Sequence, residues 1–209
     1  MQRVLVIGSG GSGKSTVAAR LGELLGLEVH HLDKVFWSAG WVKPAPDEWL
    51  KTVTDLIERD SWVIDGNYSG TLEPRLQRAD TIVFLDLPRV LCMWRIVRRF
   101  FRYRDGTRPD MAEGCHEKLD LEFVSWVWNY HRRSRPKVIR LLQEHADGKQ
   151  IFRLRSRSEV KEFLSQIKRQ TDLEHGPADV RARRDTLELP LDEAPDRESR
   201  RDPGALQSR

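Results

Sequence analysis

The sequence predicts an α/β fold, a doubly wound and mainly parallel five-stranded sheet, and three observations support this prediction. Short apolar runs rich in Val, Ile and Leu alternate along the chain with segments of helical periodicity. The apolar runs are nearly continuous, as in strands that are buried on both faces. A glycine-rich turn joins the first of these runs to the first helical segment. With 209 residues, 39% hydrophobic and 33% charged, the chain is long enough for one domain with a tail.

Each element follows from a local pattern. Strands are predicted where apolar runs end at glycine, proline or a charged residue, at residues 3–7, 27–32, 62–64, 79–87 and 151–154. Helices are predicted where apolar residues recur at helical spacing, at residues 15–25, 46–59, 89–101, within 119–145 and at 158–167. Gly26 follows the first helix, as is typical of a residue that ends one, and Pro46 suits the start of the second.

The charge distribution predicts a basic domain, residues 1–170, followed by an acidic tail, residues 171–209. The tail holds ten acidic residues and seven arginines, a net of −3, which leaves +7 for the domain out of a total of +4. Every Trp, Tyr and Phe precedes residue 171, so the tail lacks the aromatic surface that would offset its ordering entropy. We expect it to be disordered. The alternative is a charged helix docked around 180–191, although prolines interrupt that stretch.

Composition also indicates where the protein is located and which metal or disulfide sites it lacks. No apolar run approaches the ~18–20 residues of a membrane-spanning helix, and the start of the chain lacks a signal-peptide pattern, so we expect a cytoplasmic protein without an anchor. Cys92 and Cys115 form neither a disulfide framework nor a zinc motif. The six histidines show no metal-ligand pattern, and His30 and His31 are expected to be structural.

The glycine-rich turn, GSGGSGKS at 8–15, is a complete G-x-x-x-x-G-K-[ST] motif between a predicted strand and a predicted helix. Backbone N–H groups in such a loop, together with the N-terminus of the helix, bind phosphates. The residues expected to bind ATP are therefore those of the loop and the first helical turn: Gly8, Ser9, Gly10, Gly11, Ser12, Gly13, Lys14, Ser15 and Thr16. Lys14 should bridge the β- and γ-phosphates, and the Ser15 hydroxyl should ligate Mg²⁺. The motif predicts a P-loop NTPase.

Three functional classes share this motif: a kinase, an NTP-driven switch or ATPase, and a nucleic-acid-binding protein that uses the nucleotide structurally. The D-x-x-G and N-K-x-D motifs of switch GTPases do not occur in the sequence, and large motor ATPases need a longer chain. A compact domain with a basic flap favours an ATP-dependent kinase acting on a small molecule, because phosphoryl transfer depends mainly on positioning and charge neutralisation.

Three aspartates follow predicted strands, where the ligand site of a parallel sheet lies. Asp65 directly follows the strand at 62–64 and is expected to support the Mg²⁺ shell; the alternative is an Asp that only stabilises its own turn. Asp86 competes for the same role, but the apolar run continues past it. Asp33 is expected to orient the acceptor oxygen, with a helix cap as the alternative.

A dense group of arginines predicts a mobile basic helical lid at about 95–118. Arg95, Arg98 and Arg99 fall on one helical stripe, and Arg132 and Arg133 follow further along the chain. Such cations stabilise charge on the transferring group when a site closes. The residues expected to take part in catalysis are Lys14, Asp33, Arg95, Arg98, Arg99, Arg132 and Arg133. The alternatives are plain surface charge and contact with unpaired nucleic acid, on which interleaved aromatic residues would stack.

The segment 36–41, FWSAGW, is expected to hold the acceptor together with the lid. Its two tryptophans could stack on a planar group, which favours a nucleoside or nucleotide over a sugar or a shikimate-like polyol. Plain packing of these tryptophans is the alternative.

Several ordered strings resemble the adenylate-kinase-related family labelled DNA topology modulation protein, over residues 1–168. These strings are GSGGSGKST (8–16), HLDKVFWSAGW (31–41), WVIDGNYSGTL (62–72), RADTIVFLDLPR (78–89), LCMWRIVRRFFRYR (91–104), RPDM (108–111) and DLEFVSWVWNYHRRSRP (120–136). The resemblance implies a P-loop kinase fold with a basic lid and an ATP-dependent kinase activity whose acceptor is unassigned.

Within this resemblance, Asp65-Gly66 match the Asp-Gly after the third strand of nucleotide kinases. Arg95 and Arg98 or Arg99 match arginines entering the lid, and Arg132-Arg133 match arginines leaving it. The continuation Asn67-Tyr68-Ser69 departs from the Phe-Pro-Arg of adenylate kinases. The family label also keeps a second function open, a nucleotide-binding regulator or nucleic-acid-binding P-loop protein that affects DNA topology.

Overall fold

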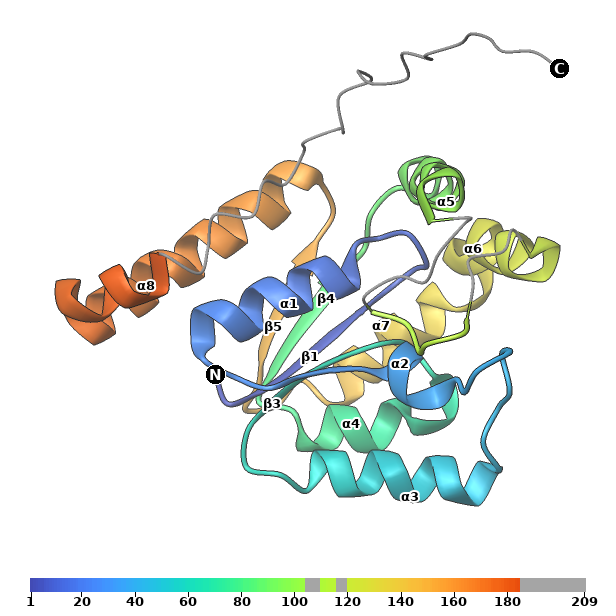
Figure 1. The fold of residues 1–209 in the computed structure, drawn as a ribbon, viewed down its shortest axis with the longest axis horizontal. Helices are drawn as coiled ribbons and strands as arrows, with labels where there is room; N and C mark the ends of the chain where they lie inside the picture. The colour runs from blue at the N-terminus through green and yellow to red at the C-terminus, as the bar shows by residue number, and fades with distance from the viewer. Residues whose placement is uncertain (104–109, 116–119, 185–209) are drawn as a thin grey trace, which may run out of the picture. The chain divides into compact units, whose positions relative to one another are not determined.

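The structure is a computed structural model that describes residues 1–103, 110–115 and 120–184 (Figure 1). The chain divides into two compact units, Met1–Thr171 and Asp172–Arg209. The domain limits expected from the sequence, 1–170 and 171–209, remain a prediction. Within the described ranges, no helix combines the length and apolar character needed to cross a membrane.

Five parallel strands form one sheet in the order β2-β3-β1-β4-β5, which confirms the predicted fold class. The strands are β1 (Arg3–Gly8), β2 (Val29–His31), β3 (Trp62–Asp65), β4 (Thr81–Leu85) and β5 (Gln150–Leu154). The strands β3 and β4 are fully buried, and β1 is buried except at Arg3, which explains why their sequences are nearly continuous apolar runs. Because all five strands are parallel, their carboxyl ends meet at one edge of the sheet.

Helices cover both faces of this sheet. They are α1 (Lys14–Leu25), α2 (Leu32–Phe36), α3 (Pro46–Ile57), α4 (Leu72–Arg78), α5 (Arg89–Tyr103), α6 (Leu121–Arg133), α7 (Arg135–Glu144) and α8 (Arg157–Arg184), with a short 3₁₀ turn, η1, at Ser69–Thr71. The helical region predicted within 119–145 is two helices: α6 ends at Arg133, and α7 begins at Arg135, with Pro136 in its first turn. The short helices α2 and α4 were not predicted.

Successive side chains of a strand point to opposite faces of the sheet, so the hydrophobic core has two layers, one on each face. Residues such as Ile64 and Phe84 pack with α3, α4 and α7, whereas Val63 and Leu85 pack with α1 and α8. This arrangement places α1 and α7 on opposite faces of the sheet, in front of it and behind it in Figure 1.

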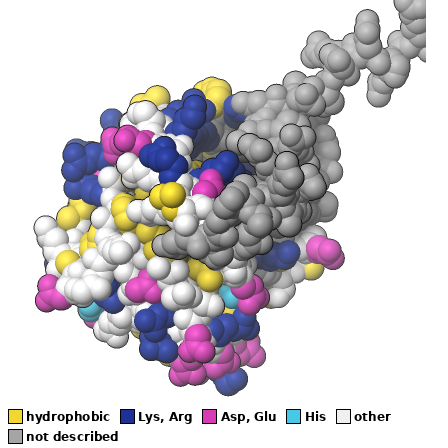
Figure 2. Space-filling model, turned by 90° about the vertical axis from the view of Figure 1, so that its left-hand side faces the viewer, with side chains coloured by type: hydrophobic (Ala, Val, Ile, Leu, Met, Phe, Trp, Pro, Cys, Tyr) yellow, Lys and Arg dark blue, Asp and Glu magenta, His cyan; other side chains and the backbone are white. Residues whose placement is uncertain are grey.

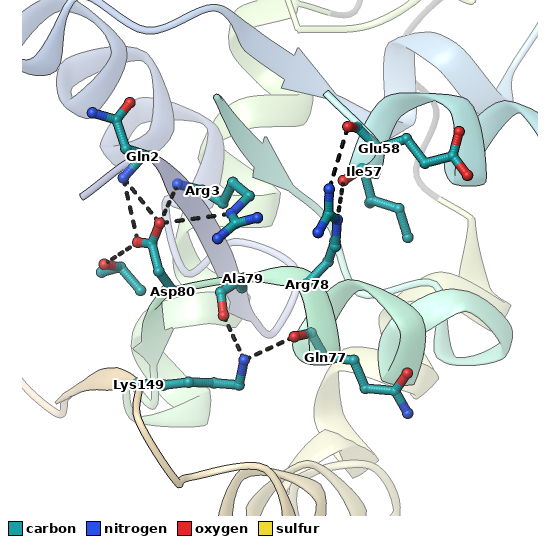
Figure 3. A network of polar contacts seen from close by, with 10 residues as sticks. Gln2, Arg3, Ile57, Glu58, Gln77, Arg78, Ala79, Asp80 and Lys149 are labelled. Atoms are coloured by element: carbon teal, nitrogen blue, oxygen red, sulfur yellow. Dashed lines mark hydrogen bonds and ion pairs between the residues drawn. The ribbon is translucent and has the colours of Figure 1, made fainter. Parts of the chain in front are cut away.

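Polar contacts join neighbouring strands at the amino-terminal edge of the sheet (Figure 3). The Asp80 carboxylate, just before β4, accepts hydrogen bonds from the backbone N–H groups of Gln2 and Arg3 at the start of β1. The Lys149 ammonium, just before β5, donates to the carbonyl groups of Gln77 and Ala79. These contacts fix the relative positions of three neighbouring strands.

The last helix is longer than the sequence indicated. We expected it to end near Ile167, but α8 continues to Arg184. The disorder expected of the tail, 171–209, stays a prediction. An existing helix gains one backbone hydrogen bond for each added residue, and the Glu, Ala and Arg residues of 173–184 favour helix despite Pro177. The rest of the expected tail, 185–209, lies outside the described residues.

Candidate active site

The phosphate loop, residues 8–15, connects β1 to α1 at the carboxyl edge of the sheet. Gly11 and Gly13 have φ values of 71° and 93°, in the left-handed region that glycine adopts without strain. A Cβ atom at Gly11 would also collide with the backbone carbonyl of Cys92 in α5. The loop therefore needs both glycines for its turn and Gly11 for close packing against α5.

Helices α5 and α6 both contact this loop. The Arg95 Nη1 atom in α5 donates a hydrogen bond of 2.8 Å to the carbonyl of Ser12. A Cβ atom at Gly10 would lie 2.7 Å from a ring carbon of Phe123 and 2.8 Å from a methyl carbon of Val127, both in α6. Helix α5, which contains the start of the expected lid, and α6, which follows the lid, thus lie against the loop. Within the expected lid, residues 104–109 and 116–118 lie outside the described residues.

Polar groups in the loop are available to an anion. The buried hydroxyl groups of Ser9 and Ser12 have no hydrogen-bond partner among the described residues. The Lys14 Nζ atom donates to the carbonyl of Ser9 at 3.0 Å. Burial lowers the pKa of Lys14, and the nearby carboxylates of Asp33 and Asp65 partly offset this effect. Unpaired donors and a partly desolvated cation fit a bound polyphosphate.

Asp65 lies at the end of β3, next to Val6 of β1 and His31 of β2. Its buried carboxylate accepts a hydrogen bond of 2.9 Å from the Ser15 hydroxyl and contacts His31 Nδ1. Burial alone would lower the pKa of His31, but the hydrogen bond to Asp65 and the charge of that carboxylate raise it. The structure thus brings together the two residues expected at the metal. It also adds His31, which we had expected to be merely structural.

Asp86 has different partners. Arg135 donates to both of its carboxylate oxygens, at 2.7 and 3.0 Å, and Arg153 donates twice to Oδ2, at 2.8 and 2.6 Å. Burial would raise the pKa of Asp86, but these hydrogen bonds and charges lower it. Asp86 is therefore an ionised partner of two arginines, whereas Asp65 contacts the phosphate loop.

Asp33, in α2, lies beside a group of aromatic residues. The Tyr68 hydroxyl donates to its carboxylate at 2.8 Å, and burial, followed by the charge of Asp33, raises the pKa of Tyr68. The Tyr68 ring packs with Phe36 and Trp49. Trp37 and Trp41 contact each other edge to face, with ring centroids 5.2 Å apart. Sequence reasoning missed Tyr68, which the fold brings next to Asp33 across 35 positions.

Asn67 and Arg75 hold the backbone around the site, and neither was identified from the sequence. The Asn67 amide donates to the Gly8 carbonyl and accepts from the Gly8 N–H, which fixes the start of the loop. The fully buried Arg75 guanidinium donates to the carbonyl groups of Gly66, Asn67, Tyr68 and Thr71. Burial lowers the pKa of Arg75 to about 9, so the group stays charged at neutral pH.

We expect the Arg75→Ala variant to lose about 2–4 kcal/mol of the free energy of unfolding, because it leaves several buried carbonyl groups without a donor. Urea unfolding with an unchanged slope would measure this loss. The control is Arg140→Ala, which removes an exposed arginine of α7 paired with Glu144 and should change stability by less than about 0.5 kcal/mol. Equal stability of the two variants would contradict the role given to Arg75.

The other expected arginines lie against aromatic rings or are exposed. Arg98 and Arg99 lie over the rings of Trp94 and Phe123, with the guanidinium carbon 5.4 and 5.7 Å from the ring centroids. Arg132 and Arg133 are exposed at the end of α6, and no hydrogen bond joins them to the phosphate loop among the described residues. Arg95 is an expected lid arginine that donates to the carbonyl groups of the loop. Lys and Arg side chains gather in the upper part of the face shown in Figure 2.

Comparison with solved structures shows which known folds the chain resembles. Shikimate kinase from Acinetobacter baumannii in complex with shikimate matches with a TM-score of 0.52 and 18% identity, covering 85% of this chain and 96% of that chain. Shikimate kinase from Bacteroides thetaiotaomicron matches with a TM-score of 0.45 and 16% identity, over 82% of this chain and 98% of that one. No protein-family model and no curated protein matches the sequence. The sheet order, the phosphate loop and the first match define a P-loop NTPase fold like that of shikimate kinase.

Proposed function

We propose that the chain is an ATP-dependent phosphotransferase that transfers the γ-phosphate of Mg·ATP to a small acceptor. The observation that carries this proposal is the hydrogen bond between Ser15 and Asp65 beside a complete phosphate loop. It joins the expected metal ligand at the start of α1 to a carboxylate at the carboxyl end of β3. P-loop NTPases hold Mg²⁺ with such a pair, a hydroxyl on the loop and a carboxylate after a strand.

The residues present fit both ATP and Mg²⁺. The unpaired hydroxyls of Ser9 and Ser12, the loop N–H groups and Lys14 are suited to the phosphates. Ser15 would ligate Mg²⁺, and Asp65 would support its water shell. The metal ion supplies positive charge that neutralises the β- and γ-phosphate oxygens. Lys14 holds a further positive charge in the same place, and Arg95 adds another above the loop.

Asp33 is proposed to orient the acceptor. The hydroxyl of Tyr68 occupies one of its carboxylate oxygens and fixes the rotamer, which leaves the other oxygen for an acceptor hydroxyl. The Trp37 and Trp41 rings lie on the segment that follows Asp33, so a planar acceptor would have aromatic surface beside the carboxylate. We therefore propose a nucleoside or nucleotide as the acceptor. A polyol is the second class to test, since the structurally similar kinase was solved with shikimate.

The test is a screen for acceptor-stimulated release of ADP with nucleosides, nucleoside monophosphates and polyols. We expect one class to stimulate release, and expect Asp33→Asn to lower kcat for that acceptor by about 10²–10⁴-fold, because the carboxylate acts on the reacting hydroxyl. Tyr68→Phe should give a smaller loss, since it only removes the hydrogen bond that fixes Asp33. The control is Asp47→Asn, at the exposed start of α3.

Two results would contradict this proposal. If no acceptor stimulates ADP release, the protein is an ATPase or a regulator. If Asp33→Asn retains full activity, Asp33 does not act on the acceptor.

Contact with unpaired nucleic acid is the second candidate function, and the exposed aromatic residues of α5 favour it. Trp94 and Phe101 are 51% and 66% exposed, and Arg98 lies over Trp94. Bases could stack on such a surface. Affinity for single-stranded DNA that falls steeply with salt and does not respond to ATP would support this function over the kinase.

A further inference from the structure

A basic cavity lies at the carboxyl ends of β4 and β5, at the same edge of the sheet as the phosphate loop. It has a volume of about 420 Å³ and is lined by Asp86, Pro88, His131, Arg135, Arg153 and Arg155. These residues come from α6, α7, β5 and the segments that follow β4 and β5, and none belongs to the loop at 8–15. Cavities of this size hold small molecules in other proteins.

The cavity lies on the α7 face of the sheet. Phe84 of β4 packs in the core layer of α7, and Asp86, two positions on, bonds to Arg135 of α7. The helix that begins at the phosphate loop, α1, packs on the opposite face with Leu85. The cavity and α1 therefore lie on opposite faces of the sheet, although Leu85, next to Asp86, pairs with Gly8 at the start of the loop.

The cavity carries an excess of positive charge. Three guanidinium groups face one ionised carboxylate, which gives a net charge of +2 at neutral pH before His131 is counted. The Asp86 side chain is 3% exposed, while those of Arg135 and Arg153 are 29% and 33% exposed. The carboxylate is thus buried behind the two arginines, and the guanidinium groups are the accessible charges.

The arginines have hydrogen-bond donors to spare. Arg135 and Arg153 use Nε and Nη2 on Asp86, which leaves the Nη1 group of each without a hydrogen bond among the described residues. The Arg155 side chain has no hydrogen bond or ion pair within that part of the chain, while its backbone N–H is held by Glu159. His131 Nε2 lies 3.1 Å from the Leu87 carbonyl and must donate to it. Asp86 therefore preorganises two guanidinium groups with their outer donors unpaired.

We propose that this cavity is a second anion site that binds a small phosphate-bearing anion, either inorganic phosphate or a phosphate monoester. A dianionic phosphate group matches the net charge of +2, and guanidinium groups bind phosphate oxygens through paired N–H donors. The site does not depend on the proposed kinase activity, since it shares no residue with the phosphate loop.

The test follows binding residue by residue, by nuclear magnetic resonance of the full-length chain carrying Lys14→Ala, which weakens the phosphate loop. Titration with inorganic phosphate should give saturable shifts of the Arg155 backbone N–H and of the Arg135 and Arg153 Nε–H groups. Arg155→Gln should weaken this binding about tenfold, the loss of one charge-assisted interaction. The control Arg140→Gln removes the same charge from an exposed position outside the cavity and should change the affinity less than about twofold.

The outcomes are distinct. A titration with glycerol phosphate separates the two sources, because tighter binding than that of inorganic phosphate identifies a monoester and equal or weaker binding identifies free phosphate. The proposal is overturned if the shifts do not saturate, if Arg155→Gln and Arg140→Gln weaken binding equally, or if succinate binds as tightly as phosphate. Shifts at residues 8–15 of the unsubstituted chain report on the kinase site separately, so failure of one site is not mistaken for failure of the other.

Discussion

Lys14→Ala should lower kcat/KM for ATP at least about a hundredfold and severely weaken binding of a non-hydrolysable ATP analogue. The substitution removes the cation that the loop holds beside Ser9, in surroundings where burial already lowers the pKa of Lys14. A charge in such a place interacts strongly with phosphate oxygens, and one group that stabilises a transition state contributes about 10²–10³-fold in rate.

Calorimetric titration with the analogue and Mg²⁺ would measure the binding, and ADP release would measure the rate. Lys51→Ala, at an exposed position of α3 paired with Asp55, should match the unsubstituted chain in both. The expected role of the loop is wrong if the folded, unsubstituted chain binds no nucleotide, or if Lys14→Ala binds it equally well.

Asp65→Asn should raise the Mg²⁺ concentration needed for half-maximal activity by about 10–100-fold, the usual effect of removing a group that supports a metal ligand. Asparagine keeps the size of the side chain and can still accept a hydrogen bond from Ser15, but it lacks the negative charge. The acceptor KM should change little, because the substitution leaves Asp33 and Tyr68 in place.

The Asp86→Asn variant tests which of the two carboxylates, Asp65 or Asp86, supports Mg²⁺. Because Asp86 neutralises Arg135 and Arg153, this variant should lose stability and keep its Mg²⁺ dependence. Magnesium titrations of ADP release, paired with urea unfolding of both variants, provide the comparison. A Mg²⁺ requirement that rises in Asp86→Asn and stays unchanged in Asp65→Asn would reverse the assignment.

The sequence predicted the fold well because its dominant features are local. Continuous apolar runs marked the buried strands, and helical spacing marked α1, α3 and α5 within a few residues of their ends. The short helices α2 and α4 span only five and seven residues, too few for periodicity to show. The end of the last helix was predicted too early, near Ile167, because the chain beyond it has few aromatic residues and several prolines, whereas α8 continues to Arg184.

The candidate site was predictable only where a residue follows a strand or lies within the loop motif. Asp65 was proposed in this way, since the position after a buried strand defines the edge of the sheet. Asn67 and Tyr68 were not, because their partners Gly8 and Asp33 are 59 and 35 positions away. The register between β1 and β3 pairs Val6 with Asp65, and this pairing brings Asn67, two residues later, next to Gly8. No local sequence pattern reveals that register.

The close approach of Gly10 to Phe123, and of Gly11 to Cys92, makes the phosphate loop and the two helices above it one steric unit. A larger residue at position 10 would require smaller ones at positions 123 and 127, so substitutions at these three positions are constrained to occur together. Chimaeras that exchange only the loop, or only α6, with another protein of this fold would therefore join surfaces that do not fit. An exchange of the loop together with α5 and α6 would keep the packed surfaces intact.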